Sequence, residues 1–327
     1  MPDGPDPASL VSTGDHDELL REVDRRCEAR DWDGLVRLAG MCRRAVDRGL
    51  QLWAVADHVD YRLALEAPGR WAGPVVTEGA GRFTPGPLPE VAASTHAWEE
   101  LAGHLPEGPG AVLVAHERVV RGENLTGAEL RGPEVLDIPR ALQRWEPAYP
   151  LATYEAHRGD FPAPPPVRMS GATAAAGGTP HADDHALGAL RDLVSVWTTG
   201  SNGRVDAVAV HGDVENAIGA LGPTTVRTAG IGLADAMAVM GWAAASGGTH
   251  GRRPGAATGR FGAWWALAAL TGHLDDWPVD GDTLAASAGR LRWYAWDAGA
   301  PATGWSLHLA VEDPQRGIAW AVSATDA

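Results

Sequence analysis

The segment at residues 161–180, FPAPPPVRMSGATAAAGGTP, constrains the fold of this chain more than any other feature of the sequence. It combines a run of prolines with small residues and carries a single charge, at Arg168. Prolines and small side chains are poorly suited to building a hydrophobic core, and they favour an extended, accessible connection. We therefore predict a linker at 161–180 between two domains, which is consistent with a chain of 327 residues.

The residues before this linker carry the hydrophobic spacing of α-helices. Apolar residues recur at intervals of three and four from Leu19 to Cys27 and again from Trp32 to Val46. Pro89, Pro109 and Pro139 each suit the first turn of a further helix. The pattern predicts a disordered tail at 1–14, an all-α domain at 15–160 that forms a bundle or a short solenoid-like stack, and a Trp-rich domain at 181–327.

The residues after the linker mix helical and strand patterns. Helices are expected at 183–198, 232–245 and 257–271, and strands at 204–211, 225–228, 291–296, 306–312 and 318–324. Alternation in the last hairpin puts Leu309 and Val311 on a core face. His308 falls on the opposite face, among small residues that would accept a covering helix. The chain as a whole is predicted to be α+β, ending in an antiparallel β-hairpin.

The charge balance excludes several classes of partner. Forty-two acidic residues against twenty-seven basic ones give a formal net charge of -15. Such a charge repels phosphate backbones and anionic lipid surfaces, so we expect neither nucleic acid nor a membrane as the partner. Every basic residue is arginine. The absence of lysine excludes Schiff-base chemistry and phosphate sites that require a lysine amine.

The two cysteines, Cys27 and Cys42, are too few for a four-cysteine zinc site or an all-cysteine iron-sulfur cluster. The first twenty residues carry acids and prolines where a signal peptide needs a basic start and an apolar run. We therefore expect a reduced cytoplasmic protein without a bound cofactor.

Four segments resemble those of an uncharacterised family of actinobacterial hypothetical proteins. They are LALEAPGRWAGPVV, GRFTPGPLPEVAASTHAW, WAAASGGTHGRRPGAATGRFGAWW, and the C-terminal pair LRWYAWDAG and GWSLHLAVEDPQRGIAWAVSATD. The resemblance extends over most of the chain. It implies a domain of unknown function and supplies no activity or binding residues that could be transferred.

The loop at 246–253, SGGTHGRR, is the candidate site for an anion. Its glycines would let a ligand approach the backbone amides, and its two guanidinium groups can each donate two hydrogen bonds to a phosphate or carboxylate. The candidate ligand-binding residues are Gly247, Gly248, His250, Arg252 and Arg253. A purely structural use of the two arginines, in pairs with carboxylates of the same chain, is the alternative.

Two further groups of residues could carry chemistry. His181 and His185 are four residues apart, so a helix would place both on one face, and His211 or Asp213 could supply a third metal ligand. A solvated helix start explains the same pattern, and no metal site is predicted. His211 could act as a general base oriented by Asp213 or Glu215, whereas the simpler interpretation has Asp213 capping the next helix.

Motif searches find no zincin helix, no G-x-S-x-G nucleophile elbow and no complete dinucleotide fingerprint. Three hypotheses remain. The first is a non-catalytic cytoplasmic protein that binds a protein partner or senses a small anionic metabolite. The second is an enzyme with a site around His211 and the 246–253 loop, and the third is a metal-binding regulator that uses His181 and His185.

Overall fold

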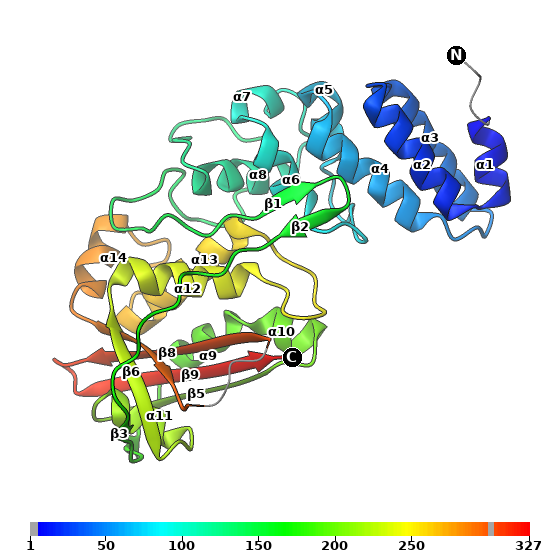
Figure 1. Cartoon of the computed structure of the whole chain (residues 1–327). Helices are drawn as coiled ribbons and strands as arrows, with labels where there is room; N and C mark the ends of the chain where they lie inside the picture. Colours follow the sequence, from blue (N-terminus) through cyan, green and yellow to red (C-terminus); the bar gives the residue numbers. More distant parts are fainter. Residues whose placement is uncertain (1–5, 300–303) are drawn as a thin grey trace. The chain divides into compact units, whose positions relative to one another are not determined.

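The computed structural model describes residues 6–299 and 304–327, and it confirms the α+β class. Helices dominate the N-terminal half, and a curled antiparallel sheet contains the C-terminal strands (Figure 1). The chain divides into two compact units. The helical unit holds the described residues up to 135 together with 152–161, and the α+β unit holds 136–151 together with the described residues from 162 onward.

The helical unit is built from short helices and one small hairpin. Its helices are α1 (Pro7–Thr13), α2 (His16–Glu28), α3 (Trp32–Val46), α4 (Trp53–Glu66), α5 (Gly69–Ala72), the 3-10 turn η1 (Gly73–Val75), α6 (Leu88–Thr95), α7 (Trp98–Leu101) and α8 (Pro109–Val120). Strands β1 (Thr153–Glu155) and β2 (Arg158–Asp160) form the antiparallel hairpin. Among the described residues, no helix is both long enough and apolar enough to cross a bilayer.

Residues 7–13, which the sequence pattern assigns to a disordered tail, form helix α1 instead. Asp6 accepts a hydrogen bond from the backbone N–H of Ala8 and so caps the helix. Leu10 and Val11 are buried in the hydrophobic cluster of α2, α3 and α4. The burial of these two side chains compensates for a helix that is too short to be stable alone.

Helix α4 lies between two hydrophobic clusters. Val55, Val59 and Leu63 pack with the apolar stripes of α2 and α3, which the spacing of the sequence predicts. Tyr61 and Leu65 pack with α6, α8 and the β1–β2 hairpin. Because α4 is buried on both sides, its charged residues Asp60 and Arg62 are buried as well, and both form ion pairs.

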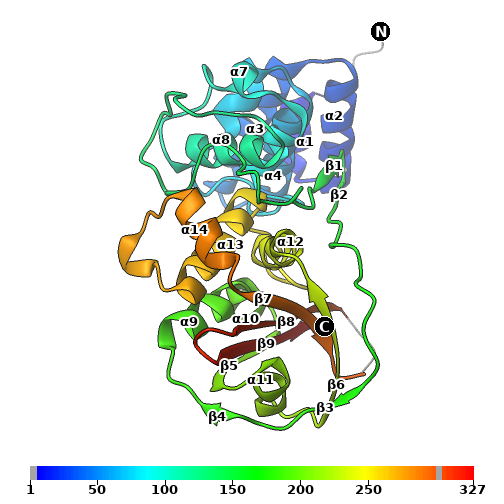
Figure 2. The same ribbon diagram turned by 90° about the vertical axis from the view of Figure 1, so that its left-hand side faces the viewer.

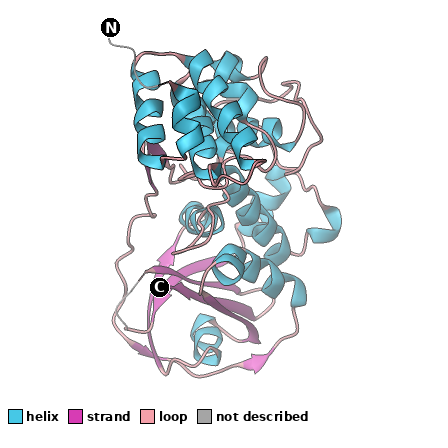
Figure 3. Ribbon diagram, turned by 90° about the vertical axis from the view of Figure 1, so that its right-hand side faces the viewer, coloured by secondary structure: helices cyan, strands magenta, loops and turns pink. Residues whose placement is uncertain are grey.

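The α+β unit is organised around one seven-stranded antiparallel sheet, with strand order β3-β6-β7-β8-β9-β5-β4 (Figure 3). Its strands are β3 (Thr173–Ala174), β4 (Thr179–Pro180), β5 (Arg204–His211), β6 (Thr225–Ile231), β7 (Arg292–Asp297), β8 (Trp305–Asp313) and β9 (Ile318–Asp326). Its helices are α9 (Asp184–Asp192), α10 (Ser195–Gly200), α11 (Val214–Ala220), α12 (Leu233–Ala245), α13 (Ala256–Thr271), η2 (Leu274–Asp276) and α14 (Gly281–Ala288).

Helices cover both faces of this sheet. Figure 2 shows α11 on one side of the strands and α12 on the other. Val214 and Ile218 of α11 pack against Ala310 and Ala319, which share the sheet face of His308. This arrangement confirms the expectation that the small residues around His308 accept a covering helix.

Residues 161–180 run along the two edges of the sheet. Strand β3 pairs with β6, and β4 pairs with β5, so this one segment supplies both edge strands. Edge strands have unpaired backbone groups, which an extended segment can satisfy. Each added strand has only two residues, and β4 ends at Pro180, which cannot donate a backbone hydrogen bond.

Residues 136–151 are predicted within the all-α domain, yet they belong to the α+β unit and form no regular helix. Glu146 binds Arg260 of α13 with a distance of 2.7 Å between Oε2 and Nε, and neither side chain is exposed to solvent. The guanidinium group of Arg260 also donates to the carbonyls of Pro139 and Ala141. Two backbone carbonyls of this segment are therefore satisfied by an arginine side chain rather than by helical hydrogen bonds.

Candidate functional site

A cavity of about 770 Å³ opens in the helical unit, between α3, α4, α5 and the irregular segment 74–83. We call it the Trp53 pocket. Its aromatic and aliphatic walls include Val36, Trp53, Trp71 and Phe83, and its charged lining consists of Asp33, Arg43, Asp57, Asp60, Arg70, Glu78 and Arg82. A cavity of this volume with an apolar lining and a few charged groups is typical of ligand-binding sites.

Large apolar side chains are exposed around this pocket. Among the described residues, five large hydrophobic side chains are exposed, and three of them line the pocket: Val36 at 46%, Trp53 at 48% and Phe83 at 59%. The other two, Val135 and Val167, lie elsewhere. Exposed apolar area costs roughly 25 cal/mol per Å² relative to burial, and its concentration at one place marks an interaction site.

Two aspartates hold the aromatic walls of the pocket in place. Asp33 accepts a hydrogen bond from the indole Nε1–H of Trp71, at 2.9 Å. Asp57 accepts one from the backbone N–H of Phe83, at 3.0 Å. The walls are therefore fixed before any ligand arrives, which reduces the entropy lost on binding.

Asp60, in the middle of α4, forms an ion pair with Arg43 of α3. Only 3% of Asp60 is exposed, and burial raises its pKa to about 6 although the neighbouring guanidinium group opposes the shift. At neutral pH the pair is ionised, and the charge of Arg43 is largely used within the protein.

Unlike Arg43, Arg70 and Arg82 contact aromatic rings of the pocket rather than a carboxylate. The guanidinium carbon of Arg70 lies 3.6 Å from the centroid of the Trp71 ring, and that of Arg82 lies 6.0 Å from the centroid of Phe83. Within residues 6–299 and 304–327, neither arginine forms an ion pair with a carboxylate. Arg70 is therefore stacked on its ring, whereas Arg82 makes a more distant cation–π contact. Both contacts leave the hydrogen-bond donors of the guanidinium group free for a carboxylate or phosphate.

Sequence reasoning missed this pocket, although the sequence contains a signal for it. Arg70-Trp71 and Arg82-Phe83 are both Arg-aromatic pairs that follow a glycine, in GRW and GRF. Each triplet alone is unremarkable in composition. The structure brings the two together with Trp53, which lies on a different helix.

The predicted anion loop at 246–253 binds a carboxylate of its own chain. The carboxylate of Asp326 accepts hydrogen bonds from the backbone N–H of Thr249, at 2.6 Å, and from the hydroxyl of Ser201, at 3.0 Å. Gly248 has a φ of +69°, and a Cβ atom there would overlap the Asp326 carboxylate. The amide of Thr249 is therefore engaged by an internal anion.

The other residues proposed for this loop are distributed between surface and interior. His250 is exposed, whereas Arg253 is only 8% exposed. Gly247 packs against the carbonyl of Gly251, where a side chain would not fit. Binding of an external anion by Arg252 and Arg253 stays a prediction.

His181 lies beside His211, with ring centroids 4.8 Å apart. The described residues contain one group of three side chains with the spacing of a metal site, and neither His181 nor His185 belongs to it. Asp183, between these two histidines, caps α9 and accepts a hydrogen bond from the indole of Trp320. The first turn of α9 thus has a structural explanation.

His211 and the 246–253 loop are not brought together. His211 ends β5 and pairs with Ile318, whereas the loop contacts Asp326, beside the other end of β5. Seven strand steps separate the two ends, or roughly 23 Å. The expected capping of α11 by Asp213 is confirmed, since its carboxylate accepts the N–H of Asn216.

The chain belongs to DUF6183, a family of unknown function whose model matches residues 17–327. No curated protein and no solved structure matches the chain.

Proposed function

We propose that this protein is a non-catalytic cytoplasmic binding protein, and that the Trp53 pocket takes up an apolar or aromatic group that carries an anion. The observation that carries this proposal is the presence of exposed aromatic rings, Trp53 and Phe83, beside two arginines without carboxylate partners among the described residues, Arg70 and Arg82.

The two parts of the ligand follow from the two kinds of lining. Trp53 and Phe83 offer apolar area that an aliphatic or aromatic group would bury. Arg70 and Arg82 supply positive charge that is not used in an ion pair within the described part of the chain. Three carboxylates of the pocket that form no ion pair among the described residues, those of Asp33, Asp57 and Glu78, oppose the anion and should reduce its affinity.

Two sources can provide this chemistry: a small amphiphilic metabolite with a carboxylate or phosphate, or a protein segment with an aromatic residue next to an acidic one. The volume of about 770 Å³ accommodates either a drug-sized molecule or one or two side chains. A metabolite and a protein segment would make the same contacts with the aromatic rings and the arginines. The experiment therefore tests small molecules and peptides separately.

The test is calorimetric titration of the full chain with aryl and alkyl carboxylates, with their neutral amides, and with short peptides that pair Trp or Phe with Glu. We expect the carboxylates or the acidic peptides to bind and the amides to bind at least tenfold more weakly. Arg70→Gln and Arg82→Gln should each weaken binding about tenfold, since each removes about 1.4 kcal/mol of charge-assisted hydrogen bonding.

Two variants serve as controls. Arg37→Gln changes an arginine of α3 with a 69% exposed side chain that does not line the pocket, and it should leave binding unchanged. Glu78→Gln should tighten binding, because it removes a negative charge from the lining. Equal affinity for carboxylates and amides, or no binding in either arm, would overturn the proposal.

A further inference from the structure

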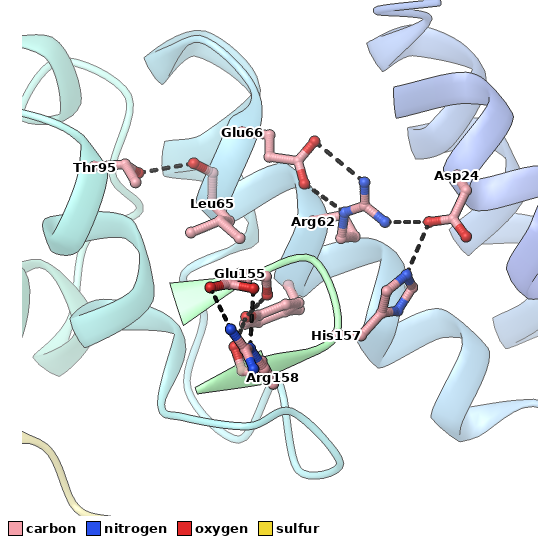
Figure 4. A network of polar contacts seen from close by, with 9 residues as sticks. Asp24, Arg62, Leu65, Glu66, Thr95, Glu155, His157 and Arg158 are labelled. Atoms are coloured by element: carbon pink, nitrogen blue, oxygen red, sulfur yellow. Dashed lines mark hydrogen bonds and ion pairs between the residues drawn. The ribbon is translucent and has the colours of Figure 1, made fainter. Parts of the chain in front are cut away.

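Three potential metal ligands meet in the helical unit, at a place that the sequence analysis does not single out. They are Asp24 of α2, His58 of α4 and His157 in the turn of the β1–β2 hairpin. One ligand atom from each of these residues lies within 4.8 Å of the others. Figure 4 shows His157 pointing at the carboxylate of Asp24 from the hairpin.

The distances between the three side chains suit an ion with tetrahedral coordination. His157 Nε2 lies 3.4 Å from Asp24 Oδ1, and the ring centroids of His58 and His157 are 5.3 Å apart. Bonds of 2.0–2.2 Å to zinc at a tetrahedral angle put neighbouring ligand atoms about 3.4 Å apart and imidazole centroids about 5 Å apart. The ligand atoms and rings therefore have roughly the separations that such an ion needs, and the two nearly parallel imidazole rings would turn toward the ion when it binds.

His58 lacks the partner that a buried imidazole requires. Its Nε2 atom is buried and has no hydrogen-bond partner in the described part of the chain. An unsatisfied buried nitrogen costs about 1–3 kcal/mol, and a metal bond would satisfy it. His157 is 59% exposed on its side chain, so an ion can reach the site from solvent.

The surroundings hold the carboxylate ligand in position. Arg62 donates to Asp24 through one nitrogen and to Glu66 through two others, as Figure 4 shows. Glu66 offsets part of the charge of Arg62. Because Arg62 donates to Oδ1 of Asp24, the oxygen that also faces His157, an ion would share this oxygen or bind Oδ2. In metal sites, hydrogen bonds from neighbouring side chains to a ligand residue commonly fix the orientation of that ligand.

A small cavity of about 240 Å³ adjoins His58 and His157 and leaves room for a fourth ligand. His16 lines this cavity together with His58 and His157. Phe83 lines both this cavity and the Trp53 pocket. The site is thus next to the proposed ligand pocket but shares no charged residue with it.

We propose that Asp24, His58 and His157 bind one zinc-class divalent ion, with His16 or water as the fourth ligand. Two imidazoles and one carboxylate are the donor set that zinc accepts, whereas magnesium and calcium prefer oxygen alone. The ion joins α2, α4 and the hairpin through ligands that are each more than thirty residues apart along the chain. It therefore anchors the returning segment 152–161 to the helical unit.

The test uses the full chain, stripped with a chelator and then titrated with zinc and, as a spectroscopic probe, with cobalt(II). We expect one ion per chain, an increase in melting temperature, and the visible absorption bands of tetrahedral cobalt. His157→Gln, at an exposed position that the fold tolerates, should weaken zinc binding at least tenfold, and His58→Gln should do the same.

Two histidine variants distinguish this site from other binding. His104→Ala removes an exposed histidine of the same unit, and His185→Ala removes one of the histidines that the sequence offers as a metal ligand. Both should bind zinc as the unchanged chain does. No zinc binding at micromolar concentration, or binding that survives His157→Gln but is lost in His185→Ala, would overturn the assignment.

Discussion

Replacement of Arg260 by methionine should destabilise the α+β unit by about 3 kcal/mol, and replacement of Glu146 by glutamine should cost more, about 4–5 kcal/mol. The pair is fully buried, with no exposure of either side chain. Removal of one partner leaves the charge of the other in the interior, which is the costly outcome for a buried ion pair.

The difference between the two variants follows from the contacts that remain. Without Arg260, the carboxylate of Glu146 still accepts hydrogen bonds from Trp264, Tyr149 and the backbone N–H of Gln143, and it can also take up a proton. With glutamine at position 146, Arg260 retains only neutral acceptors, namely two backbone carbonyls and one side-chain amide oxygen, and a guanidinium group does not lose its proton. Burial alone would raise the pKa of Glu146, but the hydrogen bonds and charge of Arg260 hold it below its usual value.

The assay is urea unfolding followed by hydrogen exchange of residues 136–151, which reports on this unit specifically. The double variant Arg260→Met, Glu146→Leu should cost less than the sum of the single variants by at least 2 kcal/mol, because it leaves no buried charge. Additive costs, or single variants that each cost under 1 kcal/mol, would refute the idea that this pair fixes the segment to α13.

Two further predictions concern titration and the glycine-rich loop. Burial raises the pKa of Asp60 to about 6 from its usual 3.8, so the folded chain binds this proton more tightly than the unfolded chain, and stability should fall as pH rises from about 4 to about 6. Urea midpoints across this range should show that slope, and Asp60→Asn should flatten it. If the 246–253 loop also binds an external anion, phosphate or citrate should raise the melting temperature, and the double variant Arg252→Gln, Arg253→Gln should abolish the increase. A variant that is strongly destabilised without any anion would show instead that these arginines are structural.

Individual elements of both units are predictable from the sequence: the apolar stripe from Trp32 to Val46 has the bounds of α3. Strand β5 has the predicted bounds, 204–211, and the final hairpin pairs Leu309 with Val322 and Val311 with Trp320, as alternation requires. These predictions succeed because one face of each strand is buried, so apolar residues recur at every second position of the sequence. The position of 136–151 was not predictable, because it depends on one contact between Glu146 and Arg260, which are 114 residues apart.

The same limit applies to both sites in the helical unit. His58 and His157 are separated by almost one hundred residues, and their meeting depends on the β1–β2 hairpin, whose three-residue strands are too short for a clear periodic signal. The Trp53 pocket depends on three segments whose order along the chain gives no indication that they meet. Local patterns specify elements, whereas these sites are properties of how the elements pack.

The charged groups of the two candidate regions are used differently, and this difference is the reason to look for function at the Trp53 pocket rather than at the 246–253 loop. In the α+β unit, the charged residues that the sequence or the fold singles out are engaged internally: Asp326 binds its own glycine-rich loop, Glu146 binds Arg260, and Asp183 caps a helix and binds Trp320. In the helical unit, Arg70 and Arg82 lie over exposed or half-buried rings without a carboxylate in the described part of the chain. Folding alone explains the first set, because each charge is satisfied within the protein. It does not explain the second set, since free guanidinium groups beside exposed aromatic rings contribute little to stability and are suited to binding something else.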